Sequence, residues 1–337
     1  MKMRKIVCSF MISVLCFMTA ISGVSATSYD TSKINAAYSK VVEYYKNNNN
    51  LNNADKILAV ESLGLEAESN QFDTSSADLS STSLSKKIVT EVLLGVDPTE
   101  DKKTLESQID ENGNVEGSWG ASSDVWTLYA LYVTSSEKAN LIANKLNDEL
   151  AASSVCGYEW GGTYYADYDT TGWVIEGLAV VNKEKYATTI NKAIDYIKNN
   201  TTMPTTGWVT ADNVDTQSQV LEGMFAYDTN ALLNDSYTVH PVDCLLNTQL
   251  SDGSFPSGYN AEYTTAEVAK TLGTYKNGSV FEKAKKAYDK MMNPEQPDNT
   301  KPAQPTDTKK DSQSTNKVET TNQKTTSVKT GDETNVV

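Results

Sequence analysis

The stretch DTTGWVIEGLAVV, residues 169–181, returns in altered form as DTQSQVLEGMFAY at residues 215–227. The two stretches share Asp, Thr, Val, Glu and Gly at the same offsets. Similarity at a fixed period is typical of repeat architectures, in which one supersecondary unit is stacked several times. The two stretches therefore predict that the chain is built from repeated helical units.

The repeat is centred on a four-residue pattern: an apolar residue, any residue, a small residue, and Leu or Met. Its small residues are Ser62, Ala130, Gly177, Gly223 and Thr271. The last three intervals between them are 47, 46 and 48 residues. The first interval is longer, because it holds an additional helical stretch, residues 83–95, and a polar segment, residues 97–118, which we predict to be a loop. A period near 47 residues accommodates two helices and two loops.

Two kinds of helix are predicted in each unit. The repeated stretch is apolar all round, as in residues 125–133, which is typical of a helix buried on every side. The second stretch is amphipathic, with apolar residues three and four apart. It covers residues 136–150, 182–200 and 279–292. Gly177 and Gly223 each cost a helix about 1 kcal/mol, which indicates that neighbouring buried helices approach closely there.

Gly- and aromatic-rich loops precede the buried helices, at residues 113–124, 156–169, 206–215 and 250–263. Buried helices with amphipathic helices outside them fit either a closed double-helical barrel or an open solenoid of the HEAT kind, whose repeats of ~40–47 residues are similar in length. Solenoid connections are shorter and plainer than these loops. The sequence therefore favours the closed barrel.

Residues 249–273 resemble the repeat of the terpene cyclase and protein prenyltransferase superfamily. Gln249, Gly253 and Phe255 match its Gln-x-x-x-Gly-x-Trp signature, with Phe in place of Trp, and residues 117–131 are a second, partial match. The resemblance covers roughly residues 54–292. It implies an all-α fold, an α/α toroid of about six helical hairpins, which cobalamin carriers and complement thioester domains also use.

The catalytic motifs of that superfamily are absent from the sequence. There is no Asp-x-Asp-Asp acid for cyclisation and no Asp-rich motif for a prenyl diphosphate and its metal. Zinc-dependent prenyl transfer needs Asp, Cys and His ligands, and His240 lies near Asp243 and Cys244 without a fourth ligand. Cys156 with Glu159 does not fit a thioester motif, which needs Gln. We therefore expect no metal and no cofactor, and terpene cyclisation is the least favoured activity.

Paired carboxylates leave an enzymatic alternative open. Glycoside hydrolysis needs two carboxyl groups about 5–10 Å apart, and Glu159, Asp169 and Asp215 lie in or beside the loops. Asp169 and Asp215 also stand where a helix N-cap belongs. Glu176 and Glu222 recur in mid-helix, which would direct them towards a barrel axis. Capping and ion pairing are the structural interpretations, and a carbohydrate-active hydrolase or lyase is the alternative.

Aromatic residues carry the binding hypothesis. Because the loops all precede buried helices, they lie at the same end of a barrel, where aromatic faces would stack on a sugar or a flat cofactor. The predicted ligand-binding ring is Trp119, Trp126, Tyr158, Trp160, Tyr164, Tyr165, Tyr168, Trp173, Trp208, Phe255, Tyr259 and Tyr263. The alternative is that these side chains plug the barrel and hold the loops in place.

The two ends of the chain predict export. Residues 1–26 have a basic start, an apolar run and a small-residue cleavage pattern, as in a secretory signal peptide. Residues 293–337 lack Trp, Phe, Tyr, Leu and Ile, which predicts a disordered tail after the toroid domain, residues 27–292. Residues 327–337 resemble a degenerate or truncated cell-wall sorting signal of Gram-positive surface proteins. Export would permit a disulfide between Cys156 and Cys244.

Charge and composition narrow the choice of ligand. The net charge of the 337 residues is −15, which disfavours nucleic acid and anionic membrane surfaces as partners. The sequence therefore predicts a secreted or cell-surface, monomeric binding module without catalysis. We expect its aromatic mouth to bind an extracellular glycan or a cobalamin-like ligand, and its tail to serve as a flexible connection to the cell wall.

Overall fold

The computed structural model describes residues 29–68, 72, 78 and 80–294. All of them belong to the first of two units into which the chain divides, residues 1–295. The predicted signal peptide, and the predicted tail beyond residue 294, lie outside the described residues.

The described residues are mostly helical, as predicted for an all-α chain. The helices are α1 (Ser32–Asn47), α2 (Ala54–Ser62), α3 (Ser81–Leu93), α4 (Thr99–Ser107), α5 (Ala121–Val133), α6 (Ala139–Ser153), α7 (Tyr168–Asn200), α8 (Met203–Thr206), α9 (Val214–Asn234), α10 (Pro241–Leu246), α11 (Ala261–Asn277) and α12 (Val280–Met292). Between α6 and α7, strands β1 (Cys156–Trp160) and β2 (Thr163–Asp167) form an antiparallel hairpin.

Buried and amphipathic helices alternate, as the repeat predicts. Nearly all side chains of α5 are buried, whereas α6 and α12 bury one side only. In α7 the predicted buried and amphipathic helices run together through a kink at Asn182, and α9 has a similar kink at Asp228. At each kink a side chain caps the helical segment that follows: Asn182 accepts a hydrogen bond from the N–H of Lys185, and Asp228 accepts one from the N–H of Ala231.

The segment at residues 97–118 differs from the loop that we predicted. It contains α4, which begins after Pro98, and Ile109 forms an isolated antiparallel bridge with Val115. Leu105 is the buried residue of α4. The helix therefore lacks the apolar periodicity that reveals the other helices in the sequence.

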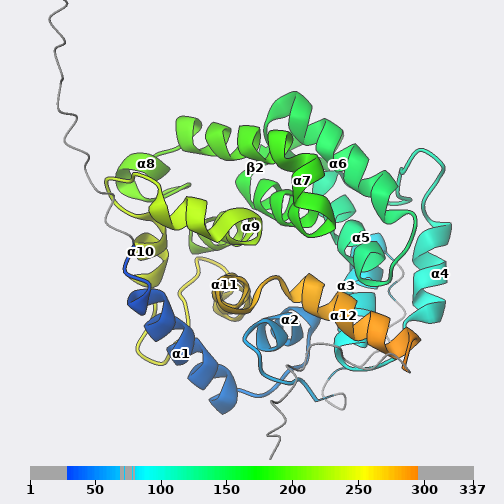
Figure 1. Cartoon of the computed structure of the whole chain (residues 1–337), viewed down its shortest axis with the longest axis horizontal. Helices are drawn as coiled ribbons and strands as arrows, with labels where there is room; N and C mark the ends of the chain where they lie inside the picture. Colours follow the sequence, from blue (N-terminus) through cyan, green and yellow to red (C-terminus); the bar gives the residue numbers. More distant parts are fainter. Residues whose placement is uncertain (1–28, 69–71, 73–77, 79, 295–337) are drawn as a thin grey trace, which may run out of the picture. The chain divides into compact units, whose positions relative to one another are not determined.

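Six of the described helices, which we call the inner helices, succeed one another as neighbours. α2 packs on α3, α3 on α5, α5 on α7, α7 on α9, and α9 on α11 (Figure 1). A Cβ atom on Gly223 would lie 2.4 Å from the carbonyl oxygen of Gly172, and one on Gly172 would lie 2.4 Å from that of Gln219. A Cβ atom on Gly177 would lie 3.2 Å from the side chain of Leu128. The close approach predicted for Gly177 and Gly223 is thereby confirmed.

The last inner helix also contacts the first. α11 packs on α2, where the Ser62 hydroxyl donates a hydrogen bond to the carbonyl oxygen of Ala269 at 3.3 Å. A Cβ atom on Gly273 would lie 2.5 Å from the Ser62 hydroxyl oxygen. At the N-terminal ends of the same two helices, Lys56 Nζ lies 2.8 Å from Glu262 Oε2.

α12 crosses over the inner helices. It contacts α2, α3 and α5 and runs from the middle of the view in Figure 1 towards its lower right. The Phe281 ring stacks on that of Tyr129, with centroids 3.6 Å apart, and the Ser279 hydroxyl donates to Glu176 Oε1 at 2.7 Å. The N-terminal end of α12 thus packs against α5 and α7.

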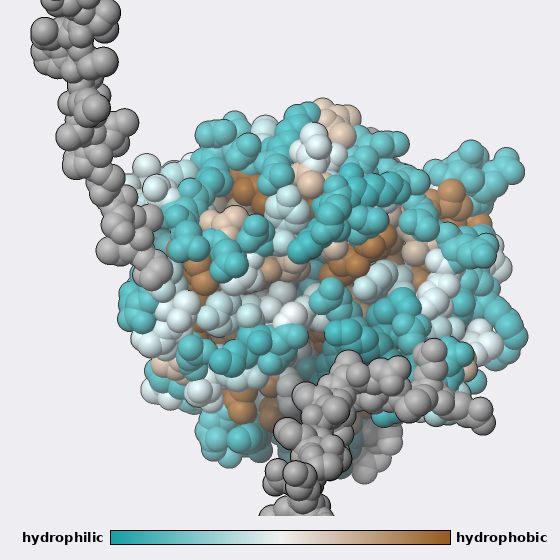
Figure 2. Space-filling model, viewed as in Figure 1, coloured by the Kyte–Doolittle hydropathy of each residue, from teal (hydrophilic) through white to brown (hydrophobic). Residues whose placement is uncertain are grey.

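Apolar side chains of the described residues gather in one core cluster. The face shown in Figure 2 is mostly hydrophilic, and apolar residues reach it only in separate areas. Within the described part of the chain, no helix has both the length and the apolar character needed to cross a membrane.

Candidate functional site

The first turns of α7 and α9 share an arrangement of cap and acid. Asp167 and Asn213 are the N-caps, because their side chains accept hydrogen bonds from backbone N–H groups three residues later. We predicted Asp169 and Asp215 as the caps, and that prediction is wrong by two residues. The carboxylates of Asp169 and Asp215 are therefore available for other contacts.

Acidic residues two positions after an N-cap also form ion pairs, and these pairs connect α2 with its neighbours α3 and α11. Asp55, two residues after the cap of α2, lies 2.8 Å from Lys86 of α3. Glu262, two residues after the cap of α11, lies 2.8 Å from Lys56 of α2. The acid that follows each cap thus bridges to the next inner helix.

Asp169 and Asp215 make the corresponding contacts through threonines. Asp169 of α7 accepts a hydrogen bond from Thr216 of α9, and Asp215 of α9 accepts one from Thr264 of α11. The repeated Asp of the opening stretches is explained by these contacts between successive helices.

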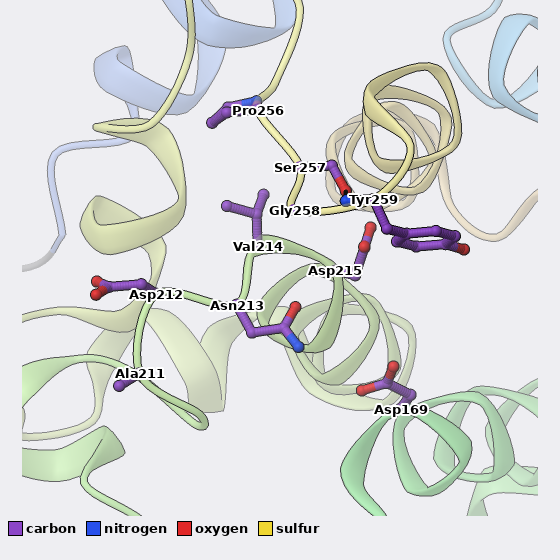
Figure 3. A pocket seen from close by; sticks show the side chains of 10 residues that line it. All are labelled: Asp169, Ala211, Asp212, Asn213, Val214, Asp215, Pro256, Ser257, Gly258 and Tyr259. Atoms are coloured by element: carbon purple, nitrogen blue, oxygen red, sulfur yellow. Dashed lines mark hydrogen bonds between the residues drawn. The ribbon is translucent and has the colours of Figure 1, made fainter.

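A pocket of about 450 Å³ lies between the first turns of α7 and α9 and the loop before α11. Its lining residues are Asp169, Ala211, Asp212, Asn213, Val214, Asp215, Pro256, Ser257, Gly258 and Tyr259. In Figure 3 the Asn213 side chain points towards Asp169 and the Tyr259 ring lies beside Asp215, whereas Asp212 points away from them. The volume is within the ~300–1,000 Å³ of small-molecule sites.

Burial raises the pKa of two of the three carboxyl groups that line this pocket. Burial raises the pKa of Asp169 to about 6; the hydrogen bond from Thr216 opposes this rise, and the charges of Asp167 and Asp215 add to it. Burial also raises the pKa of Asp215, against the effect of Thr264. Oδ1 of Asp215 is buried and has no hydrogen-bond partner among the described residues. An unpaired buried acceptor costs ~1–3 kcal/mol, so this oxygen is a cost to the folded state.

Glu159, the third carboxylate of the enzymatic alternative, does not line this pocket. It lies exposed on β1, and its backbone N–H donates to the carbonyl oxygen of Trp119. The structure brings together Asp169 and Asp215 only. Sequence reasoning missed Asn213 and Ser257 as lining residues; the cap position two residues before the repeated Asp is the signal that would have found Asn213.

The predicted aromatic ring divides into three groups. Of the twelve residues, Tyr259 lines the pocket and is 77% exposed. The residues exposed on or beside the β1–β2 hairpin are Trp119, Tyr158, Trp160, Tyr164 and Tyr165. Those that are buried or partly buried are Trp126, Tyr168, Trp173, Trp208, Phe255 and Tyr263. The predicted single aromatic mouth is therefore replaced by a polar pocket and a separate aromatic hairpin.

Trp126 belongs to the core and offers no surface to a ligand. It is 2% exposed, and its ring meets those of Tyr129, Trp173 and Phe281 edge to face. The ammonium group of Lys86 lies 4.4 Å from the centroid of the Trp126 ring. For this residue the structural alternative, a side chain that fills the interior, is the one observed.

The hairpin carries its aromatic residues on two faces. Tyr158 and Tyr165 are cross-strand partners, and their rings stack with centroids 5.5 Å apart. Trp160 is two residues from Tyr158 and so shares its face; it is 67% exposed. Tyr164 lies on the other face, where its hydroxyl donates to Glu149 at 2.8 Å. The end of β2 leads into α7, the helix that supplies Asp169 to the pocket.

A buried charge cluster lies among the inner helices. Lys270, which is 1% exposed, has its Nζ 3.0 Å from Glu267 Oε2 and 3.7 Å from Glu222 Oε2. Glu176 accepts a hydrogen bond from the Tyr129 hydroxyl at 3.2 Å. Tyr129, Glu176, Glu222 and Lys270 all occupy the variable position of the four-residue pattern. The predicted inward direction of Glu176 and Glu222 is confirmed, whereas Lys270 was missed.

The charges in this cluster do not balance if every group is ionised. Burial raises the pKa of Glu222 well above its usual value; Lys270 opposes this effect, and Glu176 and Glu267 add to it. Burial lowers the pKa of Lys270, but the surrounding glutamates more than reverse this effect. The surrounding glutamates therefore favour a charged Lys270, whereas burial opposes the ionisation of Glu176, Glu222 and Glu267 together; the cluster is a structural arrangement in the core.

The cysteines and the histidine form no site together. Cys156 and Cys244 are both free, so the disulfide that export would permit is not formed; Cys156 is buried in β1, and Cys244 of α10 donates to the carbonyl oxygen of Thr206 at 3.2 Å. His240 caps α10 through Nδ1. In the described part of the chain, no three His, Cys, Asp or Glu side chains are arranged to hold a metal ion.

Comparisons with known proteins find no relative: no family model, curated protein or solved structure matches this chain. The resemblance to the terpene cyclase repeat therefore stays a prediction.

Proposed function

We propose that this chain is a ligand-binding module on an α/α toroid, with its ligand in the pocket between α7, α9 and the loop before α11. In an open solenoid each unit contacts only its neighbours, whereas here α11 contacts α2. The Ser62–Ala269 hydrogen bond and the Lys56–Glu262 ion pair join these helices at two positions along their length. This contact supports a closed ring, in which the first turns of the inner helices share one end.

The pocket lining favours a neutral ligand rich in hydroxyl groups, such as an extracellular glycan. Carboxylates accept hydrogen bonds from hydroxyls, an amide such as that of Asn213 both donates and accepts, and the exposed Tyr259 ring offers a face for stacking. Asp169 and Asp215 would repel an anion. The observation that carries the proposal is a pocket of about 450 Å³ that presents Asp169, Asp215 and the exposed Tyr259 ring together.

Three further points define this proposal. The exposed aromatic face of the hairpin, with Trp160 and Tyr165, supports a sugar ligand because such rings stack on sugars. A cobalamin-like ligand is the second ligand class, on the strength of the toroid alone. Secretion, or attachment to a cell surface, is proposed from the two chain ends.

Glycoside hydrolysis is the second candidate function, and one observation favours it. Asp169 and Asp215 line the same pocket, and burial raises the pKa of Asp169 to about 6. A carboxyl group with a pKa near the working pH can donate a proton to a leaving group while a second carboxylate acts as base or nucleophile.

Binding assays on the purified protein test both functions. We would screen a glycan array and a set of corrinoids, and measure the release of new reducing ends from each glycan that binds. Tyr259→Ala and Asp215→Asn are expected to weaken glycan binding at least tenfold without release of reducing ends. Met292→Ala, which removes an exposed apolar side chain at the end of α12, is the control and should bind as the native protein does.

The possible outcomes separate the candidates. Turnover that Asp169→Asn abolishes while binding persists would replace the binding module with a hydrolase. Binding of corrinoids alone would replace the glycan with a cobalamin-like ligand. If no variant of the pocket changes binding, the pocket is not the site.

A further inference from the structure

Two more cavities adjoin the first turn of α11. One of about 70 Å³ is lined by Asn53, Asp55, Lys56, Asn260, Glu262, Tyr263 and Ala266. Another of about 300 Å³ is lined by Tyr44, Tyr45, Asn47, Asn48, Asn49, Asn50, Lys56 and Glu262. These two cavities share Lys56 and Glu262, so they are parts of one depression between α1, α2 and α11.

This depression adjoins the pocket along the loop before α11. The pocket is lined by residues 256–259 and the smaller cavity by Asn260 and the residues that follow, so the same turn of chain forms a wall of both. The rings of Tyr259 and Tyr263, one from each cavity, are 6.1 Å apart at their centroids. These two rings therefore lie where the pocket and the smaller cavity meet.

The far cavity has its own set of hydrogen-bonding groups. Four consecutive asparagines, residues 47–50, line it; the first is the last residue of α1 and the others lie in the connection to α2. Each amide offers donors and an acceptor, which suits the adjacent hydroxyls of a sugar. Tyr44 adds a ring, and Lys56 is neutralised by Glu262 at 2.8 Å, so the lining does not select for an anion.

We propose that the asparagine cavity is a second subsite for the same ligand, which is then a linear neutral oligosaccharide rather than a single sugar. This inference rests on the proposed glycan-binding function. Packed helices lie ~8–10 Å apart, and the three cavities extend from the first turn of α7 past α11 to the α1–α2 connection. One sugar ring cannot reach across these helices, whereas several linked units can.

A chain-length series tests the subsite. The probes are the dimers and hexamers of β-1,4-linked glucose, β-1,4-linked N-acetylglucosamine and α-1,4-linked glucose, measured with the full chain by calorimetry. For the series that binds, the hexamer is expected to bind at least tenfold more tightly than the dimer. The double variant Tyr44→Ala/Asn49→Ala should reduce hexamer affinity to that of the dimer and leave the dimer unchanged. Asp215→Asn should weaken both, and Asn200→Ala, an exposed asparagine at the end of α7, is the control.

Each result has a defined meaning. Equal affinity for dimer and hexamer, or a hexamer affinity that the double variant does not change, would overturn the second subsite and leave the proposed function standing. Binding of none of the six probes would overturn the proposed function and the subsite together. Circular dichroism of the double variant should match that of the native protein, because Tyr44 is only partly buried and Asn49 is exposed.

Discussion

At the residue scale, one repeated acid serves two purposes. Asp169 and Asp215 contact threonines of the next helix, and they also line the pocket. Neither is needed as a cap, because Asp167 and Asn213 already accept the hydrogen bonds of the first turn. Held at a partly buried position, Asp169 has its pKa raised to about 6, which makes its charge a cost to the folded state near neutral pH.

Asp169→Asn is expected to change how stability depends on pH. The folded state binds the proton of Asp169 more tightly than the unfolded state does. Protonation of Asp169 therefore contributes its full stabilisation of the native protein below pH 3.8, and this contribution is lost as pH rises through about 6. A pKa raised from 3.8 to about 6 represents at most ~3 kcal/mol. Because the contact with Thr216 weakens as well, the variant should be more stable by about 1–2 kcal/mol at pH 7. Urea unfolding at pH 4, 5, 6 and 7 measures this difference.

Asp235→Asn is the control with the opposite sign. Burial opposes ionisation of Asp235, but its hydrogen bond with Lys198 lowers its pKa overall. The ionised Asp235 carboxylate stabilises the native protein above the pKa that this group has in the unfolded state, and the stabilisation is lost as pH falls. The Asp235→Asn variant should therefore be less stable than the native protein at pH 7. A lower stability of Asp169→Asn at pH 7 would contradict the raised pKa of Asp169.

At the scale of elements, a buried charge cluster links α7, α9 and α11. Lys270 of α11 is the cation for Glu222 of α9 and Glu267 of its own helix. The Ser279 hydroxyl, just before α12, donates to Glu176 of α7. Buried ion pairs contribute little net stability, but removal of one partner is costly because the other charge stays buried. The buried charges therefore favour the arrangement in which α7, α9 and α11 are packed together.

The two sides of this cluster should respond differently to mutation. Lys270→Met leaves buried carboxyl groups without a cation and is expected to destabilise the protein by about 3–5 kcal/mol. Glu222→Gln removes a carboxyl group whose ionisation burial opposes, and it should change stability by less than about 1 kcal/mol. Lys285→Met, which breaks the partly exposed pair with Asp289, is the control, with an effect below about 0.5 kcal/mol. Urea unfolding at pH 7 measures all three, and a large effect of Glu222→Gln would show that Glu222 is ionised.

At the scale of the whole described unit, the proposed ring rests on the contact between α2 and α11. A solenoid can be extended at either end, whereas in the ring that we propose this contact would leave no such end. Gly273 allows this contact, since a Cβ atom there would lie 2.6 Å from the carbonyl oxygen of Ser62. The pocket depends on the same contact, because the loop before α11 forms one of its walls.

Gly273→Val tests this contact. The added side chain would overlap the backbone of α2, and overpacking of this kind costs about 1–3 kcal/mol. Gly258→Val is the matched control, because a Cβ atom on Gly258 has no neighbour within 4 Å. Chemical denaturation should show a loss of stability for the first variant and not for the second. If both variants are equally stable, α11 does not pack on α2 in solution.

The sequence by itself determined the helices of the repeat, though not α4, together with their alternation of buried and amphipathic faces and the close contacts at Gly177 and Gly223. These features follow from the spacing of apolar and small residues within a helix, which is local. Only the tertiary structure decided that Asp169 and Asp215 share a pocket that excludes Glu159, that Trp126 is buried, that Lys270 meets Glu222, and that Cys156 and Cys244 stay apart. Such contacts join residues far apart in the chain, so they depend on how all the helices pack at once, and no local pattern encodes that packing.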